Sequence, residues 1–225
     1  MTELDLLSAY KANPFHTLGA TPRNTREELV MLQRDEALFG NEQAANVALS
    51  KLTHPESRLE AEIYWFPKAA PEDVDELLHH VESQRGMPRH AALIPAMPSI
   101  LAQFNAVRLL LSIEPIENAW DLEAHILSLA TIADGLLTEQ VMDDINDDRK
   151  QAAFTALDYQ PLVDTQIENL LNETIMHIMA RRPSILTHNA ILSLGKHFET
   201  SYKKRDSAYR NSYFLELAAE DLRLL

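Results

Sequence analysis

The sequence predicts an all-α protein, and three observations support this prediction. The chain has five glycines and eleven prolines, and it is rich in Leu, Ala and Glu, which favour helices over strands. Apolar residues recur three and four positions apart through most of the chain. No stretch alternates apolar and polar residues for long enough to indicate a β-strand. We therefore expect about nine or ten helices.

Three helices are predicted in the first third of the chain. Asn24 or Thr25 is expected to cap the first, and Glu27 and Glu28 follow in its first turn, where carboxylates interact favourably with the helix dipole. Pro55 is expected to start the third, because proline is tolerated in the first turn of a helix. The second and third helices are predicted over residues 42–52 and 55–66.

Helix follows helix in the rest of the chain. A domain boundary is expected in the segment "FPKAAPED", which separates a small helical module, residues 1–67, from an α-helical bundle, residues 68–225. The most regular apolar stripe lies in residues 161–182. The helices predicted after the boundary cover residues 71–84, 98–113, 117–133, 139–158, 161–182, 184–202 and 211–225.

Charge and composition exclude several classes of function. The net charge of −14 opposes binding to a phosphate backbone, so nucleic-acid binding is not expected, and the basic group in "YKKRDSAYR" is interpreted as a solvated turn. The chain has no cysteine, which excludes disulfides and thiolate ligands. No segment predicts a secretory signal or a membrane-spanning helix, and we expect a cytoplasmic protein.

No pattern predicts catalysis, a cofactor or a metal. The glycines are scattered, so neither a phosphate-binding loop nor a nucleophile elbow is present. Glu173 and His177 share a helix face, but no second ligand pair accompanies them, and a surface Glu–His pair is the simpler interpretation. "DDINDDR" begins like a calcium-binding loop, but Arg149 replaces the required glycine and Thr155 the required glutamate. We expect no catalytic residue, no cofactor and no metal.

Three short patterns occur in the order typical of one family. The motif Phe-x-x-Leu-Gly ends at Gly19, Thr25–Leu29 read Thr-x-x-Glu-Leu, and residues 48–58 read "ALSKLTHPESR". Over residues 12–66 the chain resembles a J-domain, and more closely the divergent J-like module found at the start of some bacterial helical proteins. The resemblance implies a chaperone-like helical module.

The tripeptide His-Pro-Asp of a working J-domain is missing from its expected place. That place, between the second and third helices of the family, corresponds here to "LFGNEQ", residues 38–43. His54-Pro55-Glu56 instead aligns with a later turn of the family pattern. The segment that corresponds to the ATPase-binding helix is net acidic rather than basic. Stimulation of the seventy-kilodalton heat-shock ATPase is therefore not expected.

Tyr64, Trp65 and Phe66 form the most aromatic tripeptide and are the interaction candidates. Such residues are enriched at interfaces, and here they are expected mainly to join the module to the bundle. The predicted function is a non-catalytic interaction or adaptor protein that docks a protein partner through helical surfaces. An enzyme with a dispersed active site in the bundle, or a co-chaperone with a non-standard loop, are the alternatives. The sequence predicts neither the partner nor the oligomeric state.

Overall fold

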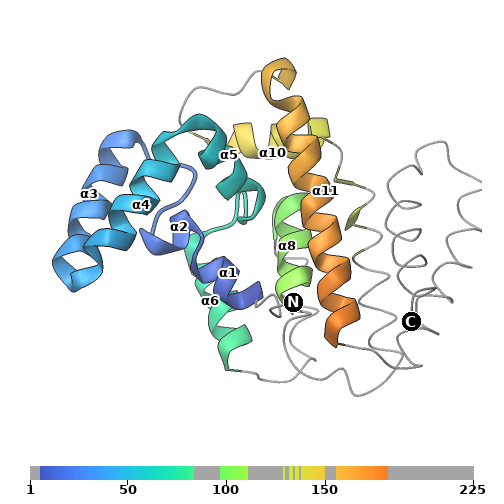
Figure 1. The fold of residues 1–225 in the computed structure, drawn as a ribbon, viewed down its shortest axis with the longest axis horizontal. Coiled ribbons are helices and arrows are strands. Elements are labelled where there is room, and N and C mark those ends of the chain that lie inside the picture. Colours follow the sequence, from blue (N-terminus) through green and yellow to red (C-terminus); the bar gives the residue numbers. More distant parts are fainter. Residues whose placement is uncertain are drawn as a thin grey trace, which may run out of the picture.

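The computed structural model describes residues 6–83, 97–110, 129, 132–133, 135–136, 138–149 and 156–181. These residues form helices and their connections and contain no strand, so the all-α prediction is confirmed for them (Figure 1). The helices predicted over residues 184–202 and 211–225, and most of the one predicted over 117–133, lie outside the described residues. The helices are α1 (Leu6–Lys11), α2 (Pro14–Thr17), α3 (Arg26–Glu36), η1 (Ala37–Asn41), α4 (Glu42–Thr53), α5 (Pro55–Ile63), α6 (Pro71–Glu82), α8 (Ile100–Leu110), α10 (Thr138–Asp148) and α11 (Ala156–Arg181).

A helical hairpin made of α3, η1 and α4 projects from one end of the described structure (Figure 1). Of the two predicted cap candidates, Thr25 caps α3 and Asn24 does not. Its hydroxyl accepts a hydrogen bond from the Glu28 amide at 3.3 Å, and the Glu28 carboxylate accepts one from the Thr25 amide at 2.8 Å. This reciprocal pair satisfies two amides that the first turn leaves without helical partners. Leu29, Ala45, Ala48 and Leu52 are buried at the base and inner side of the hairpin.

Two hydrophobic clusters hold the other helices together. One cluster combines residues of α1, α2, α4, α6 and one side of α8 with the aromatic segment that follows α5. The second combines α5 and the other side of α8 with α10 and α11. Helix α8 therefore lies between the two clusters, and each cluster draws on residues from both sides of the predicted boundary.

The aromatic segment after α5 is packed in the interior. Trp65 is 6% exposed and Phe66 1% exposed. The Phe66 ring stacks on Tyr10 with 5.4 Å between centroids, and the Trp65 ring lies 5.9 Å from Phe15. These contacts join the C-terminal end of α5 to α1 and α2.

Helix α5 ends three residues earlier than predicted, at Ile63 rather than at residue 66. Its last carbonyls accept hydrogen bonds from two distant side-chain amides instead of from a further helical turn. Asn13 donates to the Ala61 carbonyl at 2.9 Å, and Asn105 donates to the carbonyls of Ile63 and Trp65 at 2.9 and 2.6 Å. Buried carbonyls need such partners, and two asparagines from α8 and from before α2 provide them.

Among the described residues, two other helix boundaries differ from the predictions by more than two or three residues. The helix predicted over residues 139–158 ends at Asp148, and the helix predicted to start at Pro161 starts at Ala156. Pro161 therefore lies inside α11. A proline near the start of a helix removes the hydrogen bond to one carbonyl of the preceding turn, which a helix of 26 residues tolerates.

Candidate docking site on the helical hairpin

The tip of the hairpin exposes two adjacent large apolar side chains. Leu38 is 84% exposed and Phe39 82% exposed, and both belong to η1, the short kinked turn that joins α3 to α4. Gly40 follows with φ of 93°, a backbone conformation that residues with a Cβ rarely adopt. The glycine reverses the chain between α3 and α4. The tip keeps both apolar side chains outside the two hydrophobic clusters.

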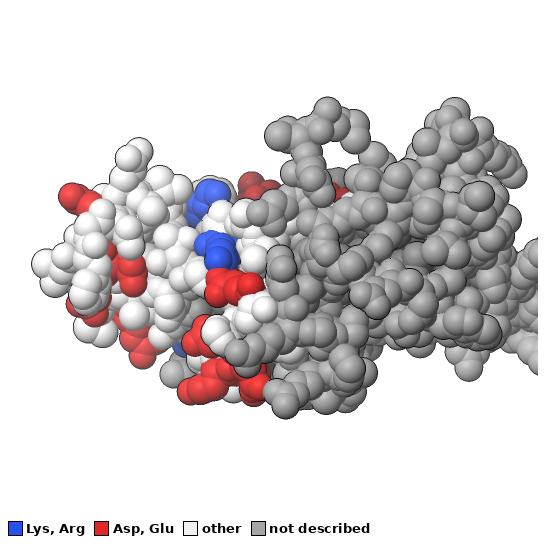
Figure 2. All heavy atoms as spheres, turned by 90° about the horizontal axis from the view of Figure 1, so that it is seen from below, with Lys and Arg blue, Asp and Glu red and all other residues white. Residues whose placement is uncertain are grey.

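Charged residues lie next to this tip, and most of them are acidic. Asp35 and Glu36 precede it together with Arg34, and Glu42 follows it at the start of α4. The Glu36 carboxylate accepts a hydrogen bond from the Asn41 amide at 3.3 Å across the turn. Figure 2 shows the hairpin end as a mostly uncharged surface with acidic patches, while the basic side chains on this face lie nearer the middle of the molecule. The exposed apolar pair therefore has a negatively charged border.

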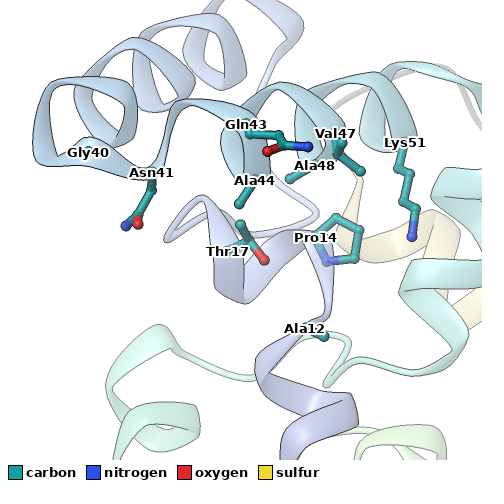
Figure 3. Close-up of a pocket in the computed structure, with 10 residues that line it drawn as sticks. All are labelled: Ala12, Pro14, Thr17, Gly40, Asn41, Gln43, Ala44, Val47, Ala48 and Lys51. Carbon is teal, nitrogen blue, oxygen red and sulfur yellow. The ribbon is translucent and has the colours of Figure 1, made fainter.

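A groove of about 550 Å³ continues from the tip along α4. The walls come from α2 and from the side of α4 that faces α2, and Figure 3 shows Gln43, Val47 and Lys51 extending from α4 with Pro14 and Thr17 facing them. Most of the lining is apolar or small. The lining residues are Ala12, Pro14, Thr17, Gly40, Asn41, Gln43, Ala44, Val47, Ala48 and Lys51.

The interaction candidates from the sequence lie elsewhere, at the interior junction of α5 with α1 and α8. Trp65 and Phe66 are buried as described above, and Tyr64 is partly buried. The Tyr64 hydroxyl donates to Glu173 at 3.4 Å, and its ring lies 5.4 Å from the Arg108 guanidinium. Burial raises the pKa of Tyr64, and the nearby Glu173 carboxylate acts in the same direction. Tyr64 therefore lies next to Arg108 and Glu173 in the interior. The role of the tripeptide in binding a partner stays a prediction.

Glu173 and His177 do not form the expected surface pair. His177 is only 3% exposed, and the Glu173 carboxylate instead forms an ion pair of 2.6 Å with Arg108. Arg108 is fully buried between Tyr10 and Tyr64, whose ring centroids lie 5.8 and 5.4 Å from its guanidinium. Pairing with a buried arginine is stronger than a surface contact with a histidine, because the interior screens charge less than water does.

The acidic segment "DDINDDR" also has structural partners. Asp144 and Asp147 accept hydrogen bonds from Lys68 at 2.9 and 3.1 Å, and Asp148 forms an ion pair of 2.8 Å with Arg23. Lys68 adopts a left-handed backbone conformation, with φ of 65°, at the turn between α5 and α6. Within the described part of the chain, no three His, Asp or Glu side chains come together as a metal site.

Comparison with known proteins identified no relative of this chain. No family model matches the sequence, and no curated protein and no solved structure shows a significant match to the chain. Among the described helices, none is both long and apolar enough to cross a membrane.

The hairpin tip was not among the predicted interaction candidates. Its signal in the sequence is a pair of large apolar residues, Leu38 and Phe39, followed by a glycine between two predicted helices.

Proposed function

We propose that this chain is a non-catalytic docking protein whose helical hairpin inserts its tip into an apolar pocket on a partner protein. The observation that carries the proposal is the exposure of Leu38 and Phe39, at 84% and 82%. Adjacent exposed apolar residues with a polar border are typical of binding surfaces, and aromatic side chains are frequent binding anchors. The chain gains no stability from the two side chains at this position, because neither packs in a hydrophobic cluster.

The charge at the tip indicates the chemistry of the partner. Beside Leu38 and Phe39, the carboxylates of Asp35, Glu36 and Glu42 outnumber the one guanidinium of Arg34, so a matching pocket would have a net basic border of Lys and Arg. Complementary charge increases the rate of association and disfavours acidic surfaces. The proposed partner is therefore a protein with an apolar pocket in a basic surface.

The resemblance to a J-domain supports the same assignment. In that family, the turn between the second and third helices carries the contact with the chaperone, and here the turn is Leu38-Phe39-Gly40-Asn41. The exposed charges of α3 are mixed, with Arg26 and Arg34 beside Glu27 and Asp35. A J-like hairpin with an apolar tip and no basic face is suited to docking, not to stimulation of the heat-shock ATPase.

Photo-crosslinking in the native host tests the proposal. The residue p-benzoylphenylalanine is placed at Phe39 of the tip in one chain and at the exposed position of Glu76 on α6 in another. We expect a discrete adduct from position 39 and none from position 76. The crosslinked protein is then purified, and its binding to the wild-type chain and to the L38S/F39S variant is compared by calorimetry.

The expected result is a loss of binding in L38S/F39S without a change in melting temperature, because exposed side chains contribute little to stability. Equal binding by both chains would reject the proposal. A wild-type dimer that L38S/F39S converts to a monomer in sedimentation experiments would also reject it, since the tip would then bind a second copy of the chain.

A further inference from the structure

We propose that the groove between α2 and α4 binds a short extended segment of a partner protein that is apolar and carries an acidic side chain. The volume of about 550 Å³ is in the range of ligand sites. The groove runs along α4 from Asn41 to Lys51, a distance of about 15 Å at the rise of an α-helix. An extended peptide of about four or five residues spans this length.

The walls of the groove fit apolar side chains. The apolar lining residues are Pro14, Ala44, Val47 and Ala48. Val47 is 51% exposed, whereas other apolar residues of α4 are buried in the protein. The alanines leave room, and a ligand side chain that covered Val47 would remove apolar surface from water. This surface faces α2 and is distinct from the apolar pair at the hairpin tip.

Lys51 gives the groove its charge preference. Its ammonium group lies at the end of the groove opposite Asn41 (Figure 3). Lys11 and Lys68 each form an ion pair with a carboxylate, whereas in the described part of the chain no carboxylate lies within ion-pair distance of Lys51. The position in the last turn of α4 is favourable for a cation. The ammonium group still has donors for a carboxylate of a ligand.

Polar side chains along the groove can bind the backbone of such a segment. The Gln43 side chain is exposed and extends from α4 over the groove. An amide side chain offers both a donor and an acceptor, which is what an extended peptide backbone requires. The apolar walls, the amide and the terminal cation together define the ligand class as an acidic, apolar peptide.

A random heptapeptide library displayed on phage and panned against the full chain tests this assignment. We expect the selected peptides to combine apolar residues with at least one Asp or Glu. The best peptide is synthesised with a fluorophore, and its dissociation constant is measured by fluorescence anisotropy. K51E is expected to weaken binding about tenfold or more, since it replaces attraction by repulsion. The control S50E introduces the same glutamate side chain at an exposed neighbour outside the groove lining, without removing the lysine, and is expected to bind like the wild type.

Two further variants separate the groove from the hairpin tip. A44W fills the groove at an exposed position and is expected to abolish binding, and L38S/F39S is expected to leave it unchanged. Peptides without acidic residues, or binding that persists in both K51E and A44W, would overturn the proposal. A peptide that binds K51E normally but does not bind L38S/F39S would place the ligand at the tip. That result would reject the groove as the binding site and leave the proposed docking function intact.

Discussion

Arg149 forms a bidentate ion pair with Glu62 in the interior of the protein. The Arg149 Nε lies 2.8 and 2.9 Å from the two carboxylate oxygens of Glu62, and both side chains are almost fully buried. Arg58, one turn earlier on α5, donates a second charged hydrogen bond to Glu62 at 3.0 Å and another to the Pro22 carbonyl at 2.8 Å. One carboxylate therefore holds two guanidinium groups and connects α5 with the end of α10.

Replacement of Glu62 by glutamine is expected to destabilise the protein strongly. Burial raises the pKa of Glu62, and the two guanidinium groups oppose this shift. Glutamine removes the carboxylate that pairs with both buried arginines, and breaking a buried ion pair in this way typically costs about 3–5 kcal/mol. Urea unfolding followed by circular dichroism measures the change. E60Q is the matched control at an exposed position of the same helix, and a loss below about 1 kcal/mol in E62Q would contradict the prediction.

Stability is expected to fall at alkaline pH because of two buried tyrosines. Burial raises the pKa of Tyr10, with Arg108 opposing the shift, and burial together with Glu173 raises the pKa of Tyr64. Tyrosines in the unfolded chain ionise near pH 10, so the folded state binds more protons than the unfolded state above that pH. The stabilisation is therefore fully present below about pH 10 and is lost as the pH rises further.

The Y10F/Y64F variant isolates this effect. Urea unfolding at pH values from 8 to 11 gives the free energy of unfolding of each chain, and the lysines contribute equally to both. We expect the wild type to lose stability more steeply above pH 10, by up to about 1.4 kcal/mol per pH unit for each tyrosine. Parallel curves for the two chains would show that the tyrosines do not cause the loss.

The purified protein is not expected to raise the turnover of a bacterial seventy-kilodalton heat-shock ATPase. In the proposed correspondence with a J-domain, Leu38 and Phe39 of the hairpin tip take the place of His-Pro-Asp, and most of the charged residues beside them are acidic. A steady-state ATPase assay at micromolar protein measures this, with a J-domain protein that contains the tripeptide as the positive control. Stimulation of several-fold would contradict the prediction.

Local signals in the sequence predicted part of this structure. The start of α3 was predicted to within one residue, with Asn24 or Thr25 as its cap, and the start of α5 was predicted because Pro55 fixes the backbone there. The end of α5 was not predictable, because it depends on a residue that is distant in the sequence. Asn105 donates hydrogen bonds to the carbonyls of Ile63 and Trp65. Local patterns carry no information on such distant hydrogen bonds.

The candidate site was less predictable than the fold. The sequence contains Leu38 and Phe39 within a run of apolar spacing, and burial is the usual fate of such residues. Their exposure follows from the kink between α3 and α4 and from the reversal at Gly40, which direct them away from both hydrophobic clusters. The groove depends in the same way on the packing of α2 against α4, which no single segment encodes.

Trp65 joins residues that are distant in the sequence. Its ring lies 5.9 Å from Phe15 and 5.5 Å from Phe66, and its carbonyl accepts the hydrogen bond from Asn105 of α8. The W65A variant leaves a cavity that neighbouring aromatic rings cannot fill without moving. A buried aromatic truncation of this kind costs about 3–5 kcal/mol.

We therefore expect W65A to lower the melting temperature by about 6–20 °C, since each kilocalorie corresponds to about 2–4 °C in a chain of this size. Thermal unfolding followed by circular dichroism measures this. F39A is the matched control, because it truncates an aromatic ring that is 82% exposed and is expected to melt like the wild type. An unchanged melting temperature in W65A, together with loss of a partner, would mean that Trp65 acts as a binding anchor and not as the join between α5 and its neighbours.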